Sequence, residues 1–183
     1  MDELVVVRRS RRARRWTIDV PWGEPARLTV PAWMSDREID RVLHSHRDWL
    51  AVQRASQRPR LGLEKRAISE LEGRRAAREL VSMLADEEAE ALGVEVARIQ
   101  VRDQRTRWGS CSTSGTLSFN WRLVLAPFEV LDYVVVHEVC HLREANHSKR
   151  FWRLVESRRP NWRDQKAWLD AHGPELLAFR PAA

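Results

Sequence analysis

The stretch His137-Glu138-Val139-Cys140-His141, followed by a third histidine at His147, is the part of the chain that most constrains its fold. On a helix, residues four apart lie on the same face, so the imidazoles of His137 and His141 can share one metal ion. Glu138 follows the first histidine directly, where a carboxylate can accept a proton from water. The pattern predicts a catalytic site that binds Zn²⁺.

The third ligand carries a geometric condition. If the helix continued unbroken, His147 would be rotated by about 120° from His141 and displaced by about 9 Å along the axis. We therefore expect the helix to run to about Glu144 and to turn at Asn146, which tolerates a left-handed backbone. His147 would then complete three protein ligands and leave a fourth position for water. Glu156, on the next expected helix, is the alternative third ligand.

Length and composition predict a globular protein with one ordinary core. The chain has 183 residues, of which 43% are hydrophobic. No apolar run is long enough to span a membrane, and the segment after Met1 lacks the basic start of a secretory signal. The two cysteines, Cys111 and Cys140, fit a reducing compartment. We expect a cytoplasmic protein with no membrane partner.

The basic residues are unusual in kind and in place. The formal net charge is +6, and only three of the 32 basic residues are lysines. Six arginines crowd into eight positions, namely Arg8, Arg9, Arg11, Arg12, Arg14 and Arg15. They are interpreted either as a patch that contacts nucleic-acid phosphates or as the solvated tip of a hairpin.

Alternating residues predict a β-rich portion at the start of the chain. Val5 to Val7 and Trp16 to Val20 are expected to form two strands joined around the arginine cluster, and Leu28 to Val30 a third. Ser35 followed by Glu38 is typical of a capping box, which opens a helix to about Gln53. A linker from about residue 56 to 64 then suggests two domains, residues 1–60 and 61–183.

The second portion alternates helices and short strands. A helix is expected from about residue 67 to 92, with Gly93 as its stop, and strands at 96–101 and 116–119. Pro127 opens the metal-binding helix, and Ser148 caps a helix that Pro160 closes. A last helix holds Trp162, Trp168 and Leu169. The fold class is therefore α+β.

From about residue 105 to 169 the chain resembles the YgjP-like family of small bacterial metallopeptidases, relatives of the SprT-like proteins in the zincin superfamily. The residues that carry the resemblance are Arg107-Trp108-Gly109-Ser110-Cys111-Ser112, Asn120, Tyr133 to Glu138, His141, Asn146-His147-Ser148, Phe151-Trp152, Pro160 and Trp168-Leu169. The resemblance implies a zincin-like catalytic domain with an active-site helix and a small sheet. It also implies that His137, His141 and His147 bind the metal and that Glu138 is the general base.

The metzincins share the third-histidine spacing but not the rest of the pattern. They have a glycine where this chain has Glu144. Their downstream methionine turn is also missing, since the only methionines are Met1, Met34 and Met83. The metzincin assignment therefore fails.

Several neighbours of the motif have two interpretations. Cys111 either packs or approaches the metal as a latency switch. The strand at Thr116 to Asn120 is placed to pair with an extended substrate, and Asn120 is either part of that surface or a structural cap. Tyr133, one turn before His137, either packs or donates to an oxyanion. His172 is expected to lie at a helix end.

The sequence leaves three functions to compare. The first is a zinc-dependent hydrolase that cleaves peptide bonds in peptide or protein substrates, with Glu138 as the base. The second is a metal-dependent nucleotide pyrophosphohydrolase, against which stand the absence of a phosphate-binding glycine loop and the imidazole ligands. The third is a nucleic-acid-associated protein with conditional protease activity.

Overall fold

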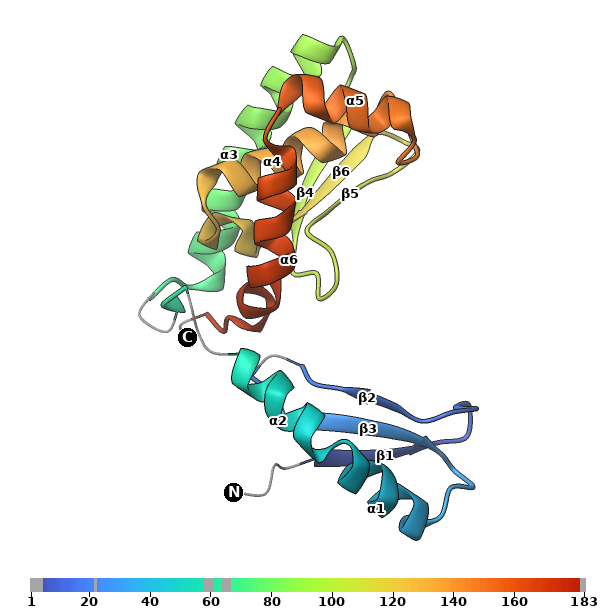
Figure 1. The fold of residues 1–183 in the computed structure, drawn as a ribbon. Coiled ribbons are helices and arrows are strands. Elements are labelled where there is room, and N and C mark those ends of the chain that lie inside the picture. Colours follow the sequence, from blue (N-terminus) through green and yellow to red (C-terminus); the bar gives the residue numbers. More distant parts are fainter. Residues whose placement is uncertain (1–4, 22, 58–60, 64–66, 182–183) are drawn as a thin grey trace. The chain divides into compact units, whose positions relative to one another are not determined.

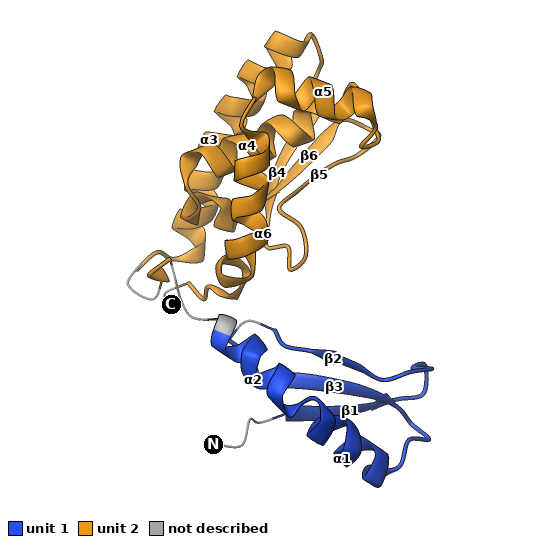
Figure 2. Cartoon of the chain, in the orientation of Figure 1, with its two compact units in different colours: residues 1–60 blue, residues 61–183 orange. Residues whose placement is uncertain are grey.

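The computed structural model describes residues 5–21, 23–57, 61–63 and 67–181. It confirms the expected α+β class and divides into two compact units, residues 1–60 and 61–183 (Figure 2). Each unit has its own buried apolar cluster. The Arg58-Pro59-Arg60 segment of the expected linker lies outside the described residues. None of the helices described is both long enough and apolar enough to cross a membrane.

The first unit contains a three-stranded sheet with strand order β1-β3-β2 (Figure 1). These strands are β1 (Val5–Ser10), β2 (Thr17–Asp19) and β3 (Ala26–Pro31). The expected hairpin around the arginine cluster is wrong, because β1 pairs in parallel and β2 antiparallel with β3, and not with each other. β3 takes the centre because Ala26, Leu28 and Val30 are fully buried there. The strand with these buried side chains therefore lies in the centre of the sheet, and the strand order differs from the order along the chain.

Two helices follow this sheet where one was expected. α1 (Asp36–Ser45) begins with the capping box between Ser35 and Glu38, which confirms that prediction. The chain then leaves helical geometry at His46, with φ −109° and ψ 9°, and α2 (Arg47–Ser56) begins at the next residue. The single helix to Gln53 is therefore wrong.

The second unit begins with the long helix α3 (Glu70–Leu92). A second capping box, between Ser69 and Glu72, starts it, and Gly93 stops it in the left-handed conformation with φ 62°. Ala77, Val81 and Ala85 are fully buried along one side of the helix. This side packs against β4, η2 and α4 and forms much of the core.

A second small sheet has the order β4-β6-β5, formed by β4 (Arg98–Arg102), β5 (Gly109–Cys111) and β6 (Thr116–Asn120). β6 pairs in parallel with β4 and antiparallel with β5. The expected substrate-pairing edge at Thr116 to Asn120 is therefore wrong, because both edges of β6 are occupied within the sheet. In the part of the chain described, β4 and β5 are the two edge strands of this sheet, and β5 is the one that contacts α4. Its three residues were not expected to form a strand.

The remaining elements are η2 (Trp121–Leu125), α4 (Phe128–Cys140), α5 (Lys149–Arg158) and α6 (Trp162–Ala178). α4 lies among α3, α5, α6 and the sheet, which is why its middle is apolar on all sides (Figure 1). Ser148 caps α5 as expected, with its side chain accepting from Arg150 and Phe151. α6 continues through Pro174, so His172 lies inside the helix and not at its end.

Candidate active site

The three histidines of the motif reach one place from three positions on the chain. His137 lies in the last turn of α4, His141 is the residue that caps that helix, and His147 follows the turn before α5. α4 ends at Cys140, earlier than the expected Glu144. The backbone N–H of Glu144 donates to the carbonyl of Cys140, and the chain then turns away from the helix axis.

The turn does not use the left-handed residue that we expected. No described residue other than glycine has a positive φ, so Asn146 does not stop the helix in that way. Its side-chain oxygen instead accepts from the backbone N–H of Ser148, 3.1 Å away. The helix nevertheless ends before His147, as a shared metal site requires.

The ring nitrogens of these histidines converge. The Nε2 atom of His147 lies 3.0 Å from that of His137 and 3.2 Å from that of His141. Ligands about 2.0–2.1 Å from a tetrahedral zinc ion would be about 3.3 Å apart, so one ion fits among them with small adjustments. In the described residues, these three form the group able to hold a metal ion, with ligand atoms within 4.8 Å of one another.

Hydrogen bonding and burial prepare the imidazoles for this role. The Nδ1 atom of His141 lies 3.1 Å from the carbonyl oxygen of Glu144, to which it can donate, and this tautomer leaves Nε2 free to bind a metal. Burial, and then the neighbouring His141 and His147, lower the pKa of His137 to about 3. His137 is therefore neutral at physiological pH, which is the form that binds metals.

Aromatic side chains of α5 hold the three rings in place. The ring of Phe151 is fully buried, and its centroid lies 4.8, 4.3 and 4.8 Å from those of His137, His141 and His147. Glu156, the alternative third ligand, pairs instead with Arg163 at 2.6 Å and is not in the histidine group. The geometry thus favours His147.

Glu138 lies beside the histidine cluster with only 6% of its surface exposed. Burial raises the pKa of its carboxyl group to about 8. The charge of a metal cation acts in the opposite direction, because it favours the carboxylate. Glu138 packs against Gly109 of β5, where a Cβ atom would stand 2.5 Å from the carboxylate Oε1. A larger residue there would require the side chain of Glu138 to shift.

A cavity of about 270 Å³ opens next to these groups. Its walls include His137 and Glu138 from α4, Trp108 just before β5, Gly109 at the start of β5, and Tyr133 one turn before His137. Burial raises the pKa of Tyr133 to about 12, so its hydroxyl stays protonated at neutral pH. Its ring packs against both His137 and Trp162.

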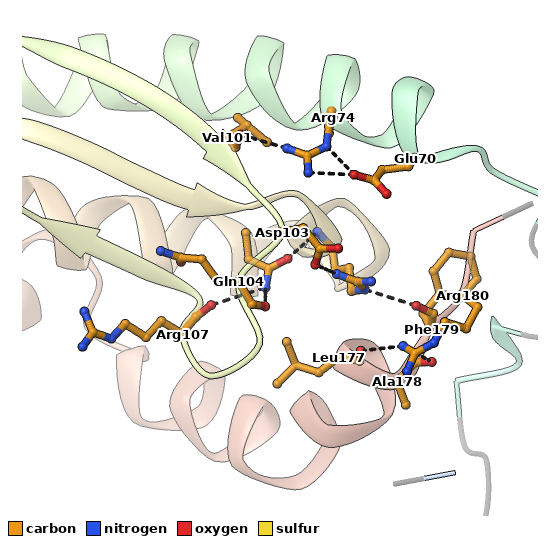
Figure 3. A network of polar contacts seen from close by, with 12 residues as sticks. Glu70, Arg74, Val101, Asp103, Gln104, Arg107, Leu177, Ala178, Phe179 and Arg180 are labelled. Carbon is orange, nitrogen blue, oxygen red and sulfur yellow. Dashed lines mark hydrogen bonds and ion pairs between the residues drawn. The ribbon is translucent and has the colours of Figure 1, made fainter. Parts of the chain in front are cut away.

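A network of polar contacts holds the loop that leads to this cavity (Figure 3). The side-chain amide of Asn120 donates to the carbonyl oxygens of Gln104, at 2.6 Å, and Arg107, at 3.3 Å. Its oxygen accepts from the backbone N–H of Arg122, whose guanidinium in turn binds Asp103 and the carbonyl oxygen of Phe179. Asn120 is therefore a buried structural cap, which decides between its two interpretations.

A buried ionic cluster behind the site escaped the sequence analysis. Glu88 of α3 and Asp132 of α4 are 1% and 8% exposed. Arg159, just after α5, contacts both carboxylates, and Arg158 contacts Glu88. The only sign of this cluster in the sequence is the basic pair Arg158-Arg159 at the end of an expected helix. The pair alone does not predict which acidic residues it contacts.

The other candidates take no part in the histidine cluster. The Cys111 thiol contacts the carbonyl oxygen of Ser112 at 3.5 Å, and burial, followed by the charge of Glu138, raises its pKa. A latency switch thus gains no support. The six arginines from Arg8 to Arg15 are all exposed, and Arg9 pairs with Asp36. No finding points to nucleic acid at these residues.

Comparison with known protein families identifies the type of site. The family model for the YgjP-like metallopeptidase domain matches residues 58–172, which is more than half of the chain. The chain belongs to the YgjP-like family. It therefore carries a metallopeptidase domain, and that domain includes the histidine group, Glu138 and the cavity.

Two solved structures resemble part of the chain. The metallopeptidase zymogen abylysin of Pyrococcus abyssi is 23% identical, with a TM-score of 0.45, and the match covers 49% of this chain and 90% of that one. The zymogen jannalysin of Methanocaldococcus jannaschii is 20% identical, with a TM-score of 0.44, over 49% and 92%. A search of curated proteins found no match.

Proposed function

We propose that this metallopeptidase is zinc-dependent, with His137, His141 and His147 as the metal ligands and Glu138 as the general base. The observation that carries the proposal is the convergence of three Nε2 atoms, 3.0 and 3.2 Å apart. Three imidazoles that leave a fourth position open are the donor set of a catalytic zinc site. When bound there, zinc supplies a Lewis acid that polarises a carbonyl and makes water more acidic.

The protein groups supply positioning and proton transfer. The carboxylate of Glu138 accepts a proton from the attacking water and delivers it to the leaving amine. Its burial and its contact with Gly109 keep it in one place, so that little reorganisation is needed in the transition state. Trp108 and Tyr133 line the cavity next to this acid.

The substrate backbone has a place to bind at β5. The carbonyl of Trp108 and the N–H of Ser112 both face β6, since they bond to Asn120 and Thr116. Antiparallel pairs alternate, so the backbone groups of Gly109 and Cys111 point to the free edge of the sheet. We propose that an extended peptide adds there as a further strand. This moves the proposed substrate edge from the central strand β6 to β5.

The domain and compartment assignments remain part of this proposal. We propose residues 61–183 as the catalytic domain and residues 1–60 as a separate domain, in a cytoplasmic protein. Both cysteines are free, which fits a reducing compartment. The nucleotide and nucleic-acid alternatives are not adopted, because the family match points to peptide bonds.

The test compares zinc-loaded wild-type protein with Glu138→Gln on a protein digest and a nucleotide panel. The amide matches the carboxylate in shape but cannot accept a proton, so peptide cleavage should fall by about 10² to 10⁴ while zinc stays bound. Equal peptide cleavage in the two proteins would contradict the role of Glu138. Nucleotide hydrolysis lost only in the variant would favour the pyrophosphohydrolase instead.

A further inference from the structure

The cavity beside Glu138 has a size and a position that the cleavage chemistry does not itself require. Its volume is about 270 Å³. Pockets for whole small-molecule ligands usually measure about 300–1,000 Å³, so this one suits a single large side chain. Because His137 and Glu138 form part of its wall, whatever fills it lies directly next to the bond being cleaved.

Part of the wall of the cavity is apolar. Tyr133, Val134 and Leu169 are 5%, 4% and 8% exposed, and the indole of Trp108 adds an aromatic surface. An apolar side chain placed there is removed from water without leaving a charge unpaired. An acidic side chain would instead lie close to the carboxyl group of Glu138.

Besides Glu138, the charged residues that line the cavity are Arg107, Lys166 and Asp170. Lys166 and Asp170, one turn apart on α6, form an ion pair of 2.7 Å, with side chains 48% and 67% exposed. A lysine already paired in this way offers little to an acidic substrate residue. This pair therefore adds no net charge to the cavity.

The aromatic wall is held rigidly from behind. A Cβ atom at Gly173 of α6 would stand 3.1 Å from Cζ2 of Trp108, so the indole packs directly on the helix backbone. On its other side, the backbone of Trp108 is fixed by the bond from Asn120 N–H to its carbonyl, at 2.8 Å. The loop before it is fixed by the amide of Asn120 (Figure 3). A wall fixed at both ends can discriminate by shape.

We propose that this cavity is the specificity pocket of the peptidase and receives one bulky apolar side chain of the substrate, from a residue that flanks the cleaved bond. The inference rests on the proposed function. Trp108, Tyr133, Val134 and Leu169 provide the contact surface, and Leu169 is the residue whose truncation reports on it most directly. Peptides with phenylalanine, leucine or methionine at that position are cleaved in preference to peptides with glycine or aspartate.

The first experiment determines the residue preference of the peptidase from its cleavage products. Zinc-loaded protein is incubated with a peptide library, and the residues on both sides of each new terminus are identified by mass spectrometry. We expect enrichment of large apolar residues on one side. For two peptides that differ only in phenylalanine or glycine at that position, we expect kcat/KM to differ by about tenfold to 100-fold. Uniform residues on both sides, or enrichment of acidic ones, overturn the proposal.

Two variants link that preference to the pocket. Leu169→Ala should reduce the phenylalanine-to-glycine ratio of kcat/KM by roughly tenfold. The ratio is independent of how much protein is folded, so a loss of stability does not imitate this result. Lys166→Met, which keeps the aliphatic stem, should retain the aromatic preference. An unchanged ratio in Leu169→Ala, or a preference that disappears in Lys166→Met, contradicts the assignment.

A binding measurement separates this inference from the proposed chemistry, because it needs no turnover. N-acetyl-phenylalanine amide is titrated into Glu138→Gln protein, and the indole N–H signal of Trp108 is followed by NMR after assignment with Trp108→Phe. We expect a saturable shift that N-acetyl-aspartate amide does not cause. If the shift is seen but wild-type protein cleaves no peptide, the proposed peptidase mechanism is rejected, whereas the pocket for an apolar side chain is retained. No shift would reject the pocket.

Discussion

Gly109 and Glu138 are separated by 28 residues of chain, yet they lie so close that a Cβ atom on the glycine would stand 2.5 Å from Oε1 and 2.6 Å from Cγ of the glutamate. Such distances are shorter than any van der Waals contact. A side chain at position 109 of the edge strand β5 would therefore require the proposed catalytic acid to move. Substitution of Gly109 therefore tests whether catalysis depends on the position of Glu138.

We expect Gly109→Ala to keep its metal and to lose most of its peptidase activity. The added methyl group must displace the carboxylate, and a misplacement of about 1 Å can cost about 10²-fold in rate. Zinc content and peptide cleavage are to be measured in the same preparation. Ser110→Ala, on the neighbouring residue of the same strand, is the matched control. A fully active Gly109→Ala would show that Glu138 can move without consequence.

Metal binding separates the two candidates for the third ligand. We expect about one zinc per chain in the wild type, a strong loss of zinc in His147→Ala, and full retention in Glu156→Ala. The reason is that His147 lies within the histidine group, whereas Glu156 is paired with Arg163. Elemental analysis after dialysis gives the answer. Retention in His147→Ala together with loss in Glu156→Ala would reverse the assignment.

Tyr133→Phe tests the role of the phenol in the cavity. We expect kcat/KM to fall by less than about tenfold, because the ring packing against His137 and Trp162 survives the loss of the hydroxyl. Removal of an oxyanion-stabilising donor would instead cost about 10²–10³ in kcat. Steady-state kinetics on one peptide distinguishes the two results, and a loss of the larger size would assign the hydroxyl to catalysis.

The buried ionic cluster predicts that Arg159, just after α5, contributes more to stability than Arg163, at the start of α6. Arg159→Met leaves the buried carboxylates of Glu88 and Asp132 with one partner fewer, and breaking a buried pair typically costs about 3–5 kcal/mol. Arg163→Met breaks an exposed pair with Glu156, which is worth about 0–1 kcal/mol.

Urea unfolding of the two variants, followed by far-UV circular dichroism, measures the free energies of unfolding. Equal midpoints would mean that the Glu88–Asp132–Arg159 cluster contributes little to stability.

The sequence correctly predicted structural features that depend only on neighbouring residues. The capping box at Ser35, the helix stop at Gly93 and the cap at Ser148 all appear where expected. They depend on hydrogen bonds and backbone angles within a few residues, which a short stretch of sequence determines. The short loop Ser112 to Gly115, which ends in a glycine, is a further hairpin signal in the sequence and would have predicted β5. In the structure this loop joins β5 to β6, and Gly115 has φ 76°.

The sequence by itself determined that His137 and His141 share a helical face with Glu138 beside it, because helical spacing is a local property. Only the tertiary structure decided the strand orders β1-β3-β2 and β4-β6-β5, and with them the edge at Gly109. It also decided the contact of Gly109 with Glu138 and the partners of Arg159. These relationships join segments far apart in the chain, and their formation depends on which apolar surfaces can be buried together, a property of the whole core that no single stretch of sequence contains.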